Sequence, residues 1–170
     1  MKTLSTACLA LAALAAFSSA RAEQPQTLTA HIGDIAFEAG DDDIVLVPLG
    51  SSFSLSASTK GSTAWPPPKT RIDRLAITCE SFKPGQAQVL EQRDFARSTC
   101  DVTFERGHKD MGAAPEARYT LDKDAAENRF EITRVQGKAY EGRFTFRLRD
   151  AHGQSLKVDD GRFQVEDRQL

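Results

Sequence analysis

The sequence predicts an all-β protein, an antiparallel β-sandwich of the immunoglobulin-like or a related kind with roughly nine to ten short strands. Apolar and polar residues alternate over most of the chain after residue 27, as in Phe144-Thr145-Phe146, and a period of two is typical of strands with one buried face. The alternating runs are short and are separated by turns rich in Gly, Asp and Pro. Two cysteines fall on the inward phase of their own strands, which predicts one disulfide.

Residues 1–22 have the features of a secretory signal peptide. Met1-Lys2 is a short positive segment, residues 4–17 are apolar, and Ala20-Arg21-Ala22 is a small-x-small cleavage site. The mature chain would start at Glu23, and residues 23–170 have the length of one domain. The Ala-rich leader resembles bacterial Sec signals, so we expect a periplasmic or secreted protein.

The charge of the mature chain excludes some partners. Without Lys2 and Arg21 it carries 20 basic and 24 acidic side chains, a net charge of −4. This balance gives no general attraction to nucleic acid or to an anionic membrane. No later apolar run is long enough to predict a membrane span.

The first strands are predicted on both sides of Gly33-Asp34, which forms a bulge or a turn. The next run, 44–49, is continuously apolar, which predicts a central strand that is covered on both faces or passes between layers and that ends near Pro48. Alternating serines at 54, 56 and 58 predict an exposed strand face, and the acidic run 41–43 predicts a solvated turn.

Cys79 and Cys100 are the two cysteines of the mature chain, and in an oxidising compartment such a pair predicts a disulfide. The segment 87–96 between them fits neither a helical nor a strand period well, and we favour a strand because strands flank it. Further strands are predicted near Tyr119 and after residue 129, with 107–116 as a loop.

The closing segment, 140–167, has the clearest alternation and predicts a β-meander. Its runs are separated at 150–153 and at 159–161, where Asp160-Gly161 suits a tight hairpin turn. The pattern G-x-F…G-x-F-x-V within 142–165 resembles the closing hairpins of small secreted β-sandwich domains of uncharacterised bacterial families. That resemblance implies a fold and no activity.

Two surfaces are candidates for binding. Arg143, Arg147 and Arg149 project from one face of a single strand, and arginine is favoured where carboxylates, phosphates or interfaces are gripped. The alternative is a solvated face on which they pair with nearby glutamates. Trp65, followed by Pro66–Pro68, is either folded into the core or an exposed aromatic anchor on a stiff loop.

Catalytic and metal signatures are weak. His31, His108 and His152 show no spacing that places two on one side of a strand, so we predict surface histidines, no metal site and no cofactor. The serine-rich run lacks a Gly-x-Ser-x-Gly motif, and nothing selects a pair of acids for glycoside hydrolysis.

The sequence therefore favours a non-catalytic periplasmic or secreted protein that binds another macromolecule, a protein or a polyanion, such as an inhibitor or immunity-type protein. One alternative is a secreted hydrolase or carbohydrate-active domain that uses paired carboxylates. Another is a structural subunit of a surface assembly. All three rest on fold class and compartment rather than on a recognised site.

Overall fold

The structure is a computed structural model that describes residues 25–66, 70–97, 100–109 and 112–168. The predicted signal peptide lies outside these residues. The described strands are β1 (Thr27–Ile32), β2 (Ile35–Gly40), β3 (Ile44–Leu49), β4 (Ser52–Ser58), β5 (Ile72–Cys79), β6 (Gln88–Glu91), β7 (Cys100–His108), β8 (Ala117–Leu121), β9 (Arg129–Gln136), β10 (Ala139–Arg149) and β11 (Ser155–Glu166). Two short helices accompany them, η1 (Asp41–Asp43) and α1 (Gln92–Ala96).

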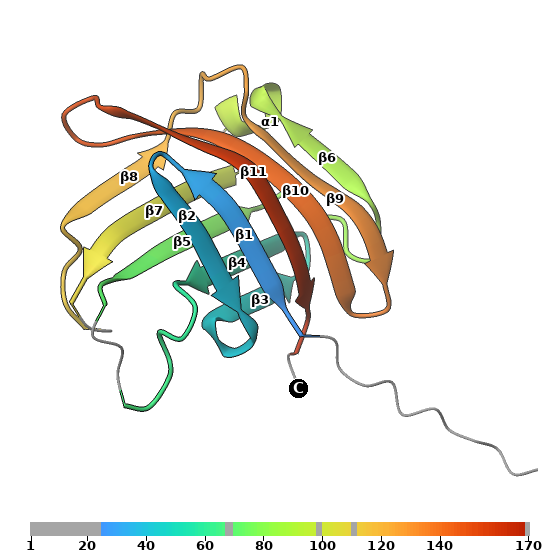
Figure 1. The fold of residues 1–170 in the computed structure, drawn as a ribbon. Coiled ribbons are helices and arrows are strands. Elements are labelled where there is room, and N and C mark those ends of the chain that lie inside the picture. Colours follow the sequence, from blue (N-terminus) through green and yellow to red (C-terminus); the bar gives the residue numbers. More distant parts are fainter. Residues whose placement is uncertain (1–24, 67–69, 98–99, 110–111, 169–170) are drawn as a thin grey trace, which may run out of the picture.

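All eleven strands belong to one antiparallel sheet, which confirms the all-β antiparallel class. The hydrogen-bonded order is β2-β1-β11-β10-β8-β7-β5-β4-β3, and β9 joins β10 beside β8 and carries β6 on its other edge. The sheet curls until its two ends approach each other, so the shape is nearly closed and barrel-like (Figure 1). The two separate sheets of an immunoglobulin-like sandwich are not confirmed, because strand alternation fixes a buried face but not how the sheet bends around it.

The core fills the inside of this curl. Inward residues of nearly every strand are buried, among them Ile32, Leu55, Ile77, Val102 and Phe146. Their alternation is the one predicted from the sequence. Among the described residues, no helix combines the length and the apolar character that a bilayer crossing requires.

Aromatic rings form a stack through the core. Phe53 packs on Phe130 at 5.1 Å between centroids, Phe130 on Phe163 at 5.3 Å, and Phe144 on Phe146 at 5.5 Å. Such aromatic pairs contribute about 0.5–1.5 kcal/mol each beyond their buried area. The stack connects β4, β9, β10 and β11, so it ties distant parts of the sheet together.

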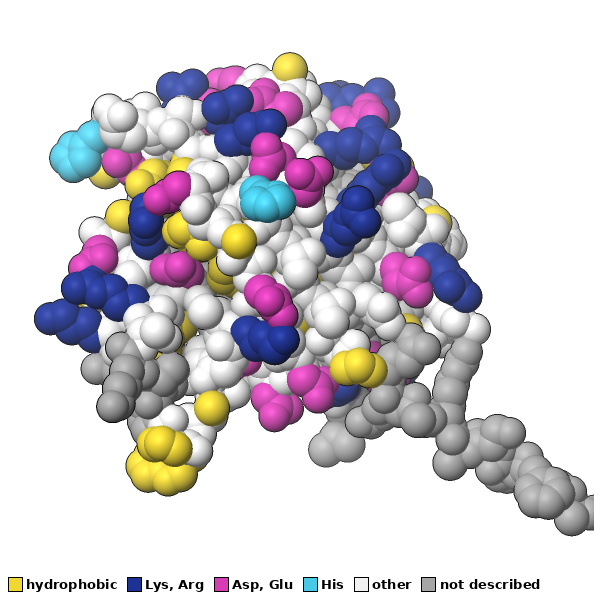
Figure 2. Space-filling view, viewed as in Figure 1, with side chains coloured by type: hydrophobic (Ala, Val, Ile, Leu, Met, Phe, Trp, Pro, Cys, Tyr) yellow, Lys and Arg dark blue, Asp and Glu magenta, His cyan; other side chains and the backbone are white. Residues whose placement is uncertain are grey.

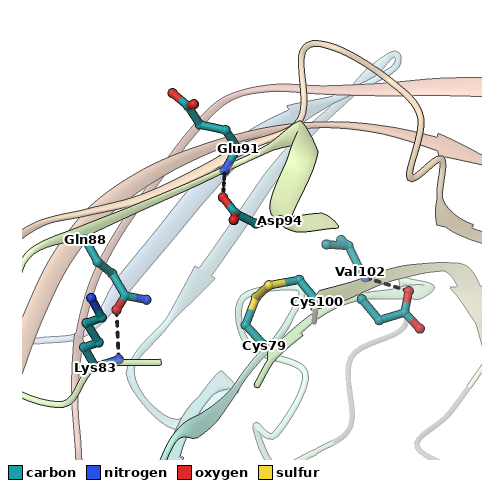
Figure 3. Close-up of a disulfide and its surroundings, with 8 residues drawn as sticks. Cys79, Lys83, Gln88, Glu91, Asp94, Cys100 and Val102 are labelled. Atoms are coloured by element: carbon teal, nitrogen blue, oxygen red, sulfur yellow. Dashed lines mark hydrogen bonds between the residues drawn. A yellow bond between two sulfur atoms is a disulfide. The ribbon is translucent and has the colours of Figure 1, made fainter. Parts of the chain in front are cut away.

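The predicted disulfide is confirmed. Cys79 ends β5 and Cys100 begins β7, and the two are direct cross-strand partners. Both are buried, and Figure 3 shows the bond beside β5 and β7. Closing a loop of this length stabilises the fold by about 3 kcal/mol in the chain-entropy model.

The segment between the cysteines is part strand and part helix. The strand predicted for 87–96 is correct only for β6, because the chain then forms α1. Glu91 and Asp94 cap this helix through reciprocal side-chain bonds to backbone amides, one of which appears in Figure 3. Phe95 is fully buried, so one turn of helix suffices to bring its ring to the core.

Strand β3 is an edge strand, so the prediction that it is central was wrong. Among the described strands it pairs only with β4, and Val45 and Leu49 are 51% and 64% exposed. Pro48 is tolerated inside it because a strand with a free edge does not need every backbone donor.

The predicted turn at 159–161 was also wrong. Strand β11 continues through these residues, and the register against β1 and β10 shifts there, which marks a β-bulge. Asp160 does adopt a positive φ of 49°. The local conformation suited to a hairpin turn is thus used to bend a continuous strand.

Candidate functional site

Trp65 is the most exposed large hydrophobic residue of those described, at 89%. It lies in the loop between β4 and β5, which we call the Trp65 loop (residues 59–66). Figures 1 and 2 show this loop protruding from the curled sheet, with hydrophobic side chains at its tip. Of the two alternatives posed by the sequence, the structure therefore places the indole outside the core.

A buried carboxylate fixes the base of the Trp65 loop. Asp43 accepts hydrogen bonds from the backbone N–H of Gly61 (2.6 Å) and Thr63 (3.0 Å) and from the hydroxyls of Ser62 (2.6 Å) and Thr63 (3.0 Å). Burial by itself raises the pKa of Asp43, but these four bonds outweigh it and hold the pKa below its ordinary value. The solvated turn predicted for 41–43 is thus wrong at Asp43, which is 9% exposed.

Two more contacts hold the same loop. Thr59 and Asp73 exchange hydrogen bonds of 2.9 Å between their backbones and through the Thr59 hydroxyl. Lys60 donates its backbone N–H to Glu38 O (2.7 Å), and its ammonium lies 2.6 Å from the Glu38 carboxylate. The loop is therefore anchored to β2, η1 and β5, and Trp65 is presented from an ordered base.

A shallow hollow of about 450 Å³ lies on the outer sheet face next to this base. Its lining includes Val45, Ser56, Thr63, Arg74 and Glu105. The floor consists of short side chains because Val45, Ser56, Ala76 and Thr103 are successive cross-strand partners on that face. Arg74, Glu105 and Arg118 also line the hollow, and Thr63 connects it to the Trp65 loop.

The arginine row lies on one face of β10, as predicted, and each guanidinium is paired within the chain. Arg143 donates to Glu131 (2.8 Å), Arg147 to Glu127 (2.6 Å) and Arg149 to Asp122 (2.7 Å). The hydrogen bond from Arg143 holds the pKa of Glu131 below its usual range. Because these acids neutralise the row, it is not a free cationic patch.

His108 departs from the prediction of a surface histidine. It ends β7 and is 2% exposed, with Nδ1 2.7 Å from the Ala113 carbonyl and Nε2 3.2 Å from a Glu105 carboxylate oxygen. The sequence around it is polar, but β7 runs two residues further than predicted and carries the ring inward.

One cluster was missed by the sequence analysis. His31 on β1 lies beside Asp159 and Asp160 on β11, and one ligand atom from each lies within 4.8 Å of the others. Only the pairing of β1 with β11 brings these residues together. No spacing within the chain signals a contact between residues so far apart in sequence.

Comparison of the chain with protein-family models, with curated proteins and with solved structures finds no match. The fold and the site define a disulfide-bonded, all-β antiparallel protein with an anchored, aromatic-tipped loop. Since a fold alone does not imply a function, the function has to be argued from this loop and the surface around it.

Proposed function

We propose that this protein is a non-catalytic binding protein, exported to the periplasm or the cell exterior, that docks on another macromolecule through the Trp65 loop. The observation that carries the proposal is a tryptophan 89% exposed on a loop whose base is fixed by a buried carboxylate. Exposing an indole to water is unfavourable, and tryptophan is among the residues that contribute most binding energy at interfaces.

The anchoring supports the proposal because it lowers the cost of binding. Ordering a flexible loop at an interface costs conformational entropy, about 0.5–1.5 kcal/mol for each immobilised side chain. The bonds to Asp43, Glu38 and Asp73 order most of the loop before any partner arrives. Trp65 is thus an anchor that needs little rearrangement.

The arginine row contributes less to this proposal than the sequence suggested. A polyanion would compete with Glu131, Glu127 and Asp122 for guanidinium groups that are already bonded. A protein partner is the better fit, since Trp65 and the neighbouring hollow offer apolar contact with charges of both signs at the margin.

The paired-carboxylate hydrolase finds little support. A general acid needs a raised pKa, whereas each carboxyl group with a shifted pKa in the described residues, Asp43, Glu127, Glu131 and Asp159, has it lowered. No observation favours the surface-assembly alternative either.

The test is capture from periplasmic and secreted extract with the mature protein and Trp65→Ala as parallel baits. Val89→Ala is the matched control because it removes another exposed hydrophobic side chain, 43% exposed, from β6. We expect a partner that both the wild type and Val89→Ala retain and that Trp65→Ala loses, with affinity reduced by about 2 kcal/mol or more.

Intrinsic fluorescence provides a direct readout, since Trp65 is the chain's one tryptophan. Emission should shift to shorter wavelength when the purified partner is added, because the indole leaves water. Retention of every captured partner by Trp65→Ala would remove the proposal. An Arg143/Arg147/Arg149→Glu bait, confirmed folded, then reports whether the β10 face binds instead.

A further inference from the structure

The β-bulge of β11 places two consecutive aspartates beside a histidine of β1. Thr29 pairs with Arg162 and His31 pairs with Asp159, so Asp160 and Gly161 together face the single residue Ala30. In a regular strand Asp159 and Asp160 would point to opposite faces of the sheet. The extra residue, with Asp160 at positive φ, breaks that alternation.

The resulting cluster lies on the outer face and is open to solvent. His31 Nδ1 is 3.6 Å from Asp160 Oδ2, and a ligand atom from each of the three residues lies within 4.8 Å of the other two. A histidine and acidic side chains adjoin over β1 and β11 in Figure 2. The three donors come from two paired strands of the sheet, so their backbone positions are fixed.

We propose that His31, Asp159 and Asp160 form a binding site for a divalent transition-metal ion, with Zn²⁺ as the probe of choice. Protein ligands lie about 2.0–2.2 Å from zinc, so two ligands of one ion are separated by about 3–3.5 Å. The His31–Asp160 pair is already near this separation. The third ligand atom lies within 4.8 Å of the other two and approaches further by rotation about its side-chain torsions.

The donor set indicates the class of ion. An imidazole nitrogen with two carboxylates suits zinc and its first-row neighbours, whereas calcium and magnesium prefer oxygen alone. Three protein ligands leave at least one coordination position open to water. The proposal is independent of the Trp65 loop, which connects β4 to β5 and contains none of the three residues.

Neighbouring cationic side chains are expected to lower the affinity of the site for a metal ion. Lys157 Nζ lies 2.6 Å from Asp159 Oδ2, and this contact, with His31 adding to it, holds the pKa of Asp159 below its usual value. Arg162 lies just beyond the bulge. A metal ion must displace Lys157 from Asp159, so removing the lysine should strengthen binding.

The experiment is a zinc titration of the mature protein, in which binding is measured by calorimetry and by changes in the NMR signals of His31. We expect saturable binding of one ion that His31→Gln and Asp160→Asn each weaken about tenfold or more. Lys157→Met should tighten it several-fold. His152→Ala is the control, since it removes an exposed histidine of the β10–β11 turn that lies outside the cluster, and it should leave affinity unchanged.

Two results would overturn the site: no saturable binding at millimolar zinc, or an affinity that survives both His31→Gln and Asp160→Asn. All four variants alter side chains on the surface, and circular dichroism checks that each is folded. The opposite effects expected for Lys157→Met and His31→Gln separate coordination from a general loss of stability, because destabilisation would not tighten binding.

Discussion

At the residue scale, two glycines make room for two phenylalanine rings. Gly142 faces Phe163 and Gly161 faces Phe144 across the β10–β11 ladder. A Cβ on Gly142 would lie 2.2 Å from the Glu131 carbonyl oxygen and 2.3 Å from the Phe163 ring, and one on Gly161 would lie 2.3 Å from the Phe144 ring and 2.6 Å from the Phe144 carbonyl oxygen. These four residues belong to the G-x-F pattern noted in the sequence, so that pattern has a packing explanation independent of any family.

We predict that Gly142→Ala and Gly161→Ala each lower the free energy of unfolding by about 1–3 kcal/mol, because either methyl group displaces a buried ring and presses on a backbone carbonyl. Urea denaturation of each variant measures the loss. Gly40→Ala is the control, since its added Cβ meets nothing closer than 3.8 Å, and it should stay within about 0.5 kcal/mol of the wild type.

A double variant tests the cause. If the clash with the ring is responsible, Gly161→Ala should cost much less in a Phe144→Leu background, where the ring is gone. Equal costs in both backgrounds would show that the glycine serves the backbone rather than the packing.

At the element scale, the Trp65 loop depends on a single side chain outside it. Asp43 terminates η1 and binds three consecutive residues of the loop, Gly61, Ser62 and Thr63. A carboxylate that accepts several hydrogen bonds from one segment fixes that segment more firmly than neutral contacts do. The order of the loop should therefore follow the charge of Asp43.

We predict that acidification loosens the Trp65 loop before it unfolds the sheet. The folded-state pKa of Asp43 lies below its ordinary value of 3.8, so its contribution to stability is present above that pH and is lost as pH falls through the lowered pKa. The protection of the Gly61 and Thr63 amides from hydrogen exchange, taken relative to the intrinsic rate at each pH, should fall there, ahead of that of amides in β10.

Asp43→Asn should produce the same loss of protection at neutral pH and reduce global stability by about 2 kcal/mol. Asp42→Asn is the control, because Asp42 is exposed and the four hydrogen bonds to the loop are all accepted by Asp43. Unchanged exchange at Gly61 and Thr63 in Asp43→Asn would show that Lys60 and Thr59 alone suffice to hold the loop.

At this scale the buried and exposed positions within a strand were predictable from the sequence, whereas the place of the strand in the sheet was not. The buried positions of β4, Phe53, Leu55 and Ala57, follow from their alternation with serines. The apolar run of β3 is the same whether the strand lies in the middle of the sheet or at its edge. The exposure of Val45 could therefore be predicted only with knowledge of the strand order. Exposure of Trp65 likewise depends on where its loop is anchored.

At the scale of the whole molecule, the pairing of strands far apart in the sequence determines the shape of the sheet and the residues that meet on it. His31 and Asp159 are cross-strand partners although most of the chain separates them. The same pairing carries β1 and β2 around towards β3 and nearly closes the sheet. Local patterns hold no information on such contacts. The disulfide was predictable because an oxidising compartment was expected and both cysteines fall on the buried side of their strands, whereas nothing comparable indicated the aspartate–histidine cluster.

The remaining gap between the ends of the sheet is bridged by polar groups in place of a β-ladder. Gln26, 3% exposed, donates its side-chain amide to the carbonyls of Asp41 (3.2 Å) and Ile44 (3.3 Å). Its side-chain oxygen accepts the backbone N–H of Glu166 at 2.9 Å. One side chain thus connects the end of β11 to η1 and β3.

We predict that Gln26→Ala lowers the free energy of unfolding by about 2–3 kcal/mol, because it leaves buried backbone groups without partners. The loss should be local in its first effect, with faster hydrogen exchange at the Glu166 amide and in β2 and β3, and little change in β10 and the rest of β11. Gln136→Ala, at an exposed end of β9, should have little effect on either measurement. Exchange that accelerates uniformly over the sheet would instead mean that Gln26 supports the whole fold cooperatively and that the nearly closed sheet opens only by unfolding.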